Sequence, residues 1–159
     1  MLASSMFMAS RKMAIWKKEK SLEDIQKWNA NTAAERLGIE FTEIGEDWLS
    51  ARMPVDSRTV QPFGILHGGA SVLLAETVGS CAANLCVEEE KAYCVGLDIN
   101  ANHLRPASHG WVTGTARPYH LGRTTHVWEI RIADEDGHLV CISRLTMAVV
   151  PRRSARAEG

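Results

Sequence analysis

Alternation of apolar and polar residues along the chain predicts six β-strands. Residues 39–44 (IEFTEI) alternate as expected for a strand with one buried face, and residues 48–53 follow a short turn as the second strand of a hairpin. Four more strand-like stretches come later, separated by Pro106, by Gly122 and by a DEDG turn. They are residues 92–104, 110–120, 124–133 and 138–149.

Helical patterns occupy the rest of the chain. Ser21 and Asp24 form a capping-box pattern that opens a short helix over residues 22–30, and a second short helix over residues 29–37 ends at a glycine. Residues 68–87 are almost entirely apolar, which predicts a long helix buried on all sides. Two strands, one buried helix and a four-stranded meander predict an α+β fold, in which an antiparallel sheet wraps around one long central helix.

Glu76 is the single charged residue inside that apolar helix. An isolated carboxylate in a protein core costs several kcal/mol unless it is paired or protonated. Two explanations are therefore open. Glu76 is either satisfied by a structural hydrogen-bond network, or it is retained for chemistry as a nucleophile or general base.

Gly68 and Gly69 stand at the start of the same helix. Unpaired N–H groups and the helix dipole favour negative charge there, so the glycines suit an oxyanion, although close packing on the sheet would explain them equally well. Gly68 and Glu76 are separated by about 12 Å along a helix. One chain therefore does not easily supply both groups to one reacting carbonyl. Two antiparallel helices in a dimer would.

Length and composition limit the classes of protein. The 159 residues fit one domain, for which we expect residues 15–151, with residues 1–14 as a disordered or start-site extension and residues 152–159 as a tail. Residues 21–151 carry 10 basic and 17 acidic residues, a poor basis for nucleic-acid binding. No apolar run is long enough for a membrane span. The four cysteines lack disulfide or zinc-ligand spacing, which favours a reducing, cytoplasmic location and no bound metal.

The order of elements, the segment QPFGILHGG at 61–69, Glu76 and the segment NANH at 100–103 together resemble the hotdog-fold acyl-CoA thioesterases. The PaaI-like branch is the most similar. It includes dihydroxynaphthoyl-CoA hydrolases and enterobactin-pathway proofreading thioesterases. The resemblance implies hydrolysis of a CoA thioester, with an aromatic acyl group such as dihydroxynaphthoyl, and no cofactor. It also implies a shared active site in a dimer that associates into a homotetramer.

The resemblance assigns roles residue by residue. Glu76 attacks the thioester or activates water, Gly68 holds the oxyanion, and Gln61 positions the thioester. His67 supports the carbonyl or the loop, and Ser80 holds the water or the carboxylate. The residues expected to bind substrate or CoA are Thr77, His103, Arg105, His120, Gly122 and Arg123. Two other classes stay open, a hotdog hydratase/dehydratase and a non-catalytic acyl-CoA binding protein. Trp16 and Trp28 lie in an N-terminal region that could cover an acyl pocket.

Overall fold

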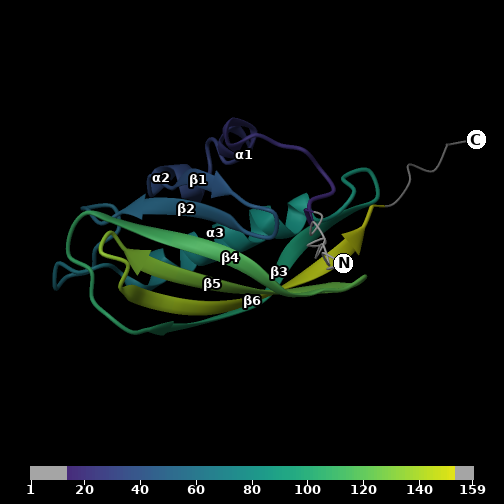
Figure 1. Cartoon of the computed structure of the whole chain (residues 1–159). Helices are drawn as coiled ribbons and strands as arrows, with labels where there is room; N and C mark the ends of the chain where they lie inside the picture. Colours follow the sequence, from purple (N-terminus) through teal and green to yellow (C-terminus); the bar gives the residue numbers. More distant parts are fainter. Residues whose placement is uncertain (1–13, 153–159) are drawn as a thin grey trace, which may run out of the picture.

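A computed structural model describes residues 14–152 of the chain. The predictions for residues 1–13 and 153–159 lie outside this part. The described chain forms one six-stranded antiparallel sheet and a long helix, α3, packed against β2, β3, β4, β5 and β6 (Figure 1). The elements are α1 Leu22–Trp28, α2 Ala33–Arg36, β1 Glu40–Ile44, β2 Leu49–Pro54, α3 Gly68–Leu85, β3 Ala92–His103, β4 Trp111–Leu121, β5 Thr125–Asp134 and β6 Leu139–Pro151.

The predicted α+β fold and all six strands are confirmed, and two predicted hairpins form. β1 pairs with β2 across a turn in which Gly45 N donates to Trp48 O at 2.8 Å. β5 pairs with β6 across the DEDG turn, where Gly137 has a φ of 81°. A positive φ is available to glycine at little cost, which explains the residue at this turn.

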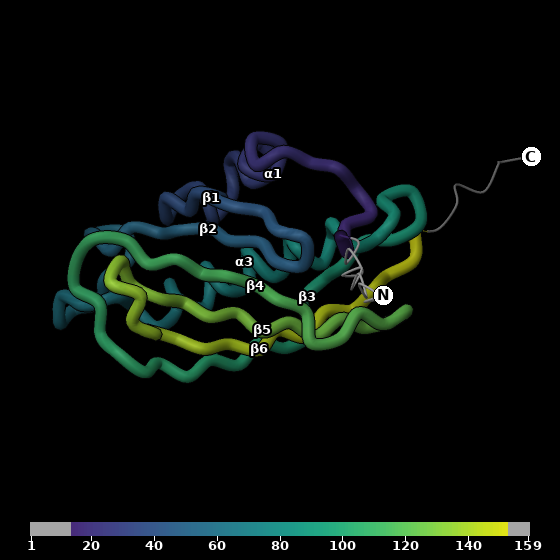
Figure 2. The backbone as a smooth tube through the Cα atoms, viewed as in Figure 1, coloured from purple at the N-terminus to yellow at the C-terminus, as the bar shows by residue number. Residues whose placement is uncertain are grey.

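The predicted four-stranded meander is confirmed for β4, β5 and β6, which pair in chain order, but it is wrong for β3. The strands lie in the order β1-β2-β4-β5-β6-β3, so β3 is at an edge beside β6, and β4 pairs with β2 (Figure 2). After β3, Leu104 N donates to Val140 O at 2.8 Å, which carries the chain past the start of β6. The connection over residues 104–110 is therefore a crossover. The meander prediction assumed that consecutive strands are neighbours, which is common but not general.

Small residues allow α3 to lie close to the sheet. Leu74, Val78 and Ala82 of α3 are fully buried, as are Trp128 and Ile130 of β5. A Cβ added to Gly79 would lie 2.6 Å from Leu145 Cδ2 on β6, so only glycine fits at this contact. The glycine lowers helix propensity, but it permits the close approach that fixes how α3 is rotated on the sheet.

The prediction that α3 is buried on all sides is wrong for this chain. Its outward stripe is partly exposed, because no element of the described chain covers it completely. The stripe comprises Gly69, Val72, Leu73, Glu76, Thr77, Ser80 and Asn84. Glu76 is thus a half-buried carboxylate on an otherwise apolar helix, which leaves it accessible to a ligand.

The N-terminal helices lie over one side of α3. The predicted capping box is present, since Asp24 N donates to Ser21 Oγ and Ser21 N donates to Asp24 Oδ2. Gln26 ties α1 to β1, because its side chain accepts from Phe41 N at 2.9 Å and donates to Ile39 O at 3.1 Å. The second helix is shorter than predicted and starts at Ala33, because Asn31 has a φ of 60° and breaks the helix before it.

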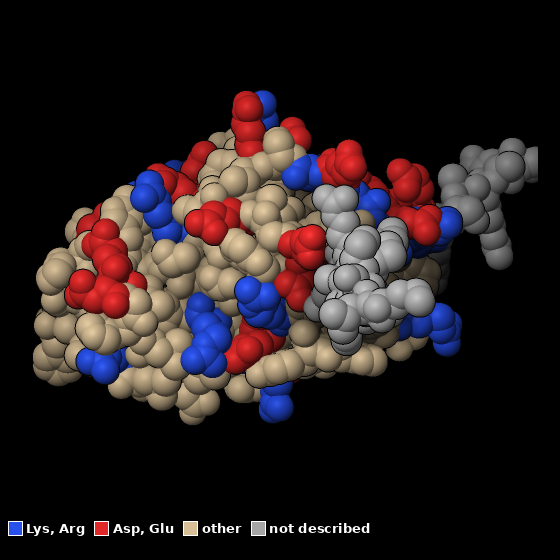
Figure 3. All heavy atoms as spheres, viewed as in Figure 1, with Lys and Arg blue, Asp and Glu red and all other residues tan. Residues whose placement is uncertain are grey.

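The surface offers no extended patch of one charge on the face drawn in Figure 3, where acidic and basic side chains are interspersed. None of the helices in the described residues combines the length and the apolar character needed to cross a membrane.

Asn84 connects α3 to the edge strand β3. Its Oδ1 accepts from Cys94 N at 2.8 Å, and its Nδ2 donates to Cys94 O and Ser80 O, both at 3.0 Å.

Replacing Asn84 by alanine leaves the Cys94 amide and carbonyl without these partners. We expect Asn84→Ala to lower the free energy of unfolding by roughly 1–3 kcal/mol, measured by urea denaturation. Ser108→Ala, at an exposed position without a side-chain hydrogen bond in residues 14–152, is the control and should change it by less than about 0.5 kcal/mol. Equal effects would contradict this role.

Candidate active site

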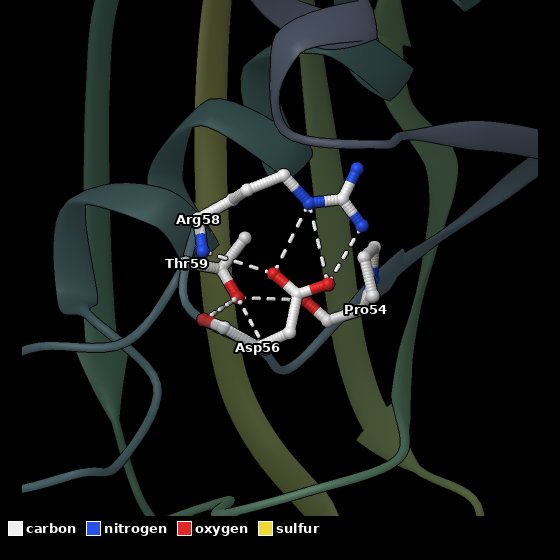
Figure 4. A network of polar contacts seen from close by, with 4 residues as sticks. All are labelled: Pro54, Asp56, Arg58 and Thr59. Atoms are coloured by element: carbon white, nitrogen blue, oxygen red, sulfur yellow. Dashed lines mark hydrogen bonds and ion pairs between the residues drawn. The ribbon is translucent and has the colours of Figure 1, made fainter.

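The segment before α3 is held by a turn at the end of β2 (Figure 4). The Thr59 hydroxyl donates to Pro54 O at 2.7 Å and accepts from Asp56 N at 3.0 Å. The Arg58 guanidinium binds the Asp56 carboxylate, with Nη2 at 2.6 Å from Oδ2. These hydrogen bonds from Arg58 lower the pKa of Asp56, so the pair stays charged at neutral pH.

This turn also fixes the start of α3. Thr59 is only 1% exposed, and its carbonyl accepts from His67 N at 2.8 Å. Leu66 N donates to Ala107 O at 2.7 Å, which ties the same segment to the loop after β3. The residues just before α3 are therefore held by backbone hydrogen bonds from two directions, and the helix N-terminus has a defined position.

His67 is the N-cap of α3. Its Nδ1 accepts from Gly69 N at 2.8 Å, which requires an unprotonated Nδ1. The Gly69 N–H is consequently used by the cap, while the Gly68 N–H has no partner among the described residues. Of the two glycines, Gly68 is the one that retains a free donor at the positive end of the helix dipole.

Gly68, Gln61, His103 and Arg105 line one cavity of about 450 Å³. The His103 ring lies against Gly68, since a Cβ there would be 2.8 Å from His103 Nε2. The Gln61 Oε1 accepts from Phe63 N, so the Gln61 amide nitrogen is the part left for a ligand. Two predicted catalytic residues and two predicted substrate-binding residues thus meet at the N-terminus of α3.

Glu76, Thr77 and Ser80 line a different cavity, of about 540 Å³. The Glu76 carboxylate makes no hydrogen bond or ion pair with any residue in 14–152. It rests against β3, because a Cβ on Gly96 would lie 2.5 Å from Glu76 Oε1. The Ser80 hydroxyl points toward Met147 Sδ at 3.7 Å and does not bond to Glu76.

A third group of predicted residues lies beyond the other end of α3. Gly122 and Arg123 line a cavity of about 590 Å³ together with Cys86, next to the C-cap of the helix. The His120 ring is close by, since a Cβ on Gly122 would be 2.5 Å from His120 Nε2. Within one chain, the predicted CoA-binding residues are therefore divided among three cavities.

The cysteines near these cavities are neutral thiols. All four are free and buried. Burial raises the pKa of Cys81, which lines the Glu76 cavity, to about 11, and that of Cys86 to about 12. A thiol with such a pKa is a weak nucleophile at neutral pH, so Cys81 is a poor candidate for the nucleophile of this cavity.

In residues 14–152, one cluster of three side chains has its possible metal-ligand atoms close together. It consists of Asp134, Asp136 and His138. It belongs to the β5–β6 turn, where Asp134 Oδ1 already accepts from Asp136 N and His138 N. It lines none of the three cavities. These hydrogen bonds account for the group as part of the turn.

Several known proteins are similar to this chain in sequence and in fold. Residues 63–141 match the thioesterase superfamily. The 1,4-dihydroxy-2-naphthoyl-CoA hydrolase of Escherichia coli is 53% identical over 136 residues, covering 86% of this chain and 99% of that protein. The chain belongs to the thioesterase superfamily. The proofreading thioesterase EntH of Cronobacter turicensis is 50% identical over 136 residues, covering 86% of this chain and 98% of that one.

The fold of this thioesterase agrees with a solved structure. The crystal structure of a thioesterase from Haemophilus influenzae is 54% identical, with a TM-score of 0.86 over 89% of this chain and 99% of that chain. The resemblance to hotdog-fold thioesterases is thereby confirmed, and the chain is a thioester hydrolase.

Several residues of the site were not predicted from the sequence. Gly96 makes room for Glu76, and Thr59 positions His67. A glycine inside a strand pattern often marks a close approach, so Gly96 carried a signal that was overlooked. Trp28 lines the Glu76 cavity, whereas Trp16 donates to Gly45 O at 2.7 Å and lines a different one. That these residues cover an acyl pocket stays a prediction.

Proposed function

We propose that the protein hydrolyses an aromatic acyl-CoA to the free acid and CoA, and that Glu76 is the nucleophile or the general base. The observation that carries the proposal is the Glu76 carboxylate, half-buried in a cavity and without a hydrogen-bond partner in residues 14–152. A carboxylate kept in an apolar helix without a structural partner is available for chemistry. An aromatic acyl group is supported by the name of the Escherichia coli relative, a dihydroxynaphthoyl-CoA hydrolase.

Two routes use the same groups. In one, a Glu76 oxygen adds to the thioester carbonyl carbon, the C–S bond breaks to release CoA thiolate, and water hydrolyses the resulting anhydride. In the other, Glu76 takes a proton from a water molecule that adds to the carbonyl carbon directly; the C–S bond then breaks, and the departing CoA sulfur takes the proton from Glu76. In both routes, the free N–H of Gly68 at the N-terminus of α3 stabilises the negative charge on the carbonyl oxygen.

The active site is proposed to be shared between two chains. Gly68 and Glu76 line different cavities and are about 12 Å apart along α3, too far for both to contact one carbonyl. Within residues 14–152, the edge strand β3 has no partner on one side and exposes Val95 and Leu97, at 42% and 63%. Pairing of β3 with a second copy about a two-fold axis would cover this edge and bring α3 of each chain beside the other.

The same dimer would assemble the divided substrate-binding residues. His103 and Arg105 lie with Gly68, whereas His120, Gly122 and Arg123 lie beyond the C-terminal end of α3. In antiparallel helices the Gly68 end of one chain faces the C-terminal half of the other. Arg105 and Arg123 are suited to CoA phosphates because a guanidinium binds phosphate with two parallel hydrogen bonds. The family resemblance extends the proposal to a tetramer of two dimers.

Replacement of Glu76 by glutamine tests the chemistry. Glutamine keeps the side-chain volume but can neither attack the thioester nor accept a proton. We expect Glu76→Gln to fold normally and to lose at least roughly a hundredfold in kcat with benzoyl-CoA, measured by release of CoA thiol. Matched circular dichroism spectra and melting temperatures provide the control. Near-normal turnover by the folded variant would remove Glu76 from the mechanism.

Gly96→Ala tests the position of the carboxylate without changing it chemically. The added methyl group would meet Glu76 Oε1 at 2.5 Å and displace it. We expect kcat to fall roughly 10- to 100-fold with little change in KM, since small displacements of a reacting group have effects of this size. The control is Gly114→Ala, whose Cβ would meet Leu74 on the sheet side of α3 at 3.3 Å. If both variants lose activity equally, the effect is general packing and not the position of Glu76.

Complementation tests the shared site. Glu76→Gln and Gly68→Val should each be inactive alone, the latter because its added carbons meet the His103 ring of its own chain. After co-expression, a heterodimer contains one site with an intact Glu76 and an intact Gly68. We expect such heterodimers, isolated by two different affinity tags, to recover up to about half the activity of the unmodified dimer, since one of two equivalent sites is intact. Stable heterodimers no more active than either parent would show that the two residues act within one chain.

A further inference from the structure

The cavity that contains Glu76 extends well beyond the carboxylate. Its volume is about 540 Å³, within the range of small-molecule sites, and it lies between the outward stripe of α3 and the α1–α2 segment. Glu76 marks the side toward β3, where its carboxylate rests against Gly96. Cys81 marks the side toward α1, where Asn29 Nδ2 lies 3.4 Å from its sulfur. The cavity therefore runs across α3, from the reactive group to the N-terminal helices.

The far wall of this cavity combines apolar side chains with Asn29 and Thr32, and it carries a half-exposed indole that has Lys20 Nζ 6.0 Å from its ring centroid. Trp28, the last residue of α1, lines the cavity and is 49% exposed. Ala33 of α2 and Leu73 of α3 line it as well. A tryptophan has more apolar surface than any other side chain, so the exposed half of the Trp28 indole offers a large apolar contact to a ligand in the cavity.

The wall is a fixed part of the fold. Ile25 of α1 is fully buried, and the Gln26 side chain is hydrogen-bonded to β1. Asn29 donates to Ile25 O at 2.8 Å while it contacts Cys81, so the end of α1 is tied to α3. Trp28 is thus presented to the cavity from a helix held on both sides, as a preformed binding surface requires.

We propose that this cavity binds the acyl group of the substrate and that Trp28 selects aromatic acyl groups by packing its indole against their ring. The proposal rests on the proposed function, because it places the thioester carbonyl at Glu76 and the acyl group across α3 from it. A stacked or edge-to-face aromatic pair is more favourable than the contact of an indole with an aliphatic chain. An aliphatic acyl group of similar length fits the same space but gains less from Trp28.

The test compares benzoyl-CoA with hexanoyl-CoA in Trp28→Ala and Trp28→Phe. We expect Trp28→Ala to lower kcat/KM for benzoyl-CoA about fivefold to tenfold more than for hexanoyl-CoA, mainly through KM, the range set by the loss of one aromatic pair. Trp28→Phe keeps an aromatic ring and should retain most of the preference. The matched control is Trp111→Phe, since Trp111 lines none of the described cavities and packs under Arg52. It should leave the ratio unchanged.

A second variant, in α2, fills the cavity from the side opposite α3. Ala33→Leu places a larger side chain on the exposed side of α2 and should lower kcat/KM for benzoyl-CoA at least tenfold without lowering the melting temperature. If Trp28→Ala affects both substrates equally and Ala33→Leu has no effect, the acyl group binds elsewhere and the proposal is wrong. This failure is distinct from failure of the proposed function, which full activity of Glu76→Gln would show whatever the Trp28 variants do.

Discussion

Close packing of α3 on the sheet is the constraint on which the site depends. Gly79 lies under Leu145, and Gly114 of β4 receives Leu74, so helix and sheet interlock at two glycines. This contact leaves one rotation for α3, because a turned helix would bring larger side chains against the sheet. With the rotation fixed, Glu76 must point outward and toward β3. The direction of the Glu76 carboxylate is therefore set by apolar contacts on the opposite side of the helix.

In this arrangement the Glu76 carboxylate makes no hydrogen bond with any residue of the described chain. Hydrogen bonding elsewhere in the fold is extensive, as the Thr59 turn and the Asn84 contact with Cys94 illustrate. Among residues 14–152, the Glu76 carboxylate has no such partner, and neither have the Gly68 N–H and the buried indole Nε1 of Trp128. Trp128 lies in the core, whereas Glu76 and Gly68 line cavities, and polar groups left unpaired at cavities are typical of functional sites.

The sequence predicted the elements well because periodicity is a local property. The alternation at residues 39–44 and the apolar run at residues 68–87 each contain their own signal. The strand order was not predictable in this way, since β3 pairs with β6, and the paired residues are far apart in sequence, from His103 with Cys141 to Ala92 with Pro151. Glu76 was predicted as a site residue because a single carboxylate stands out in an apolar helix. Gly96 matters through its contact with Glu76 across the fold, which only the structure shows. The sequence placed Trp28 in a region that could cover an acyl pocket, but only the structure shows which cavity it lines.

The glycines of the site illustrate what the sequence alone does not predict, namely which group lies against each of them. Gly68 was predicted to make room for an oxyanion and Gly122 to bind CoA. In the structure, Gly68 is covered by the His103 ring, Gly122 by the His120 ring, and Gly96 by the Glu76 carboxylate. Each glycine thus makes room for a polar side chain of its own chain, which the missing Cβ allows to lie directly on the backbone. A glycine near a site therefore indicates a close approach, but only the fold says whether a ligand or a side chain makes it. Here side chains occupy the Cβ side of each glycine, while the Gly68 N–H, without a partner in residues 14–152, is left for the proposed oxyanion.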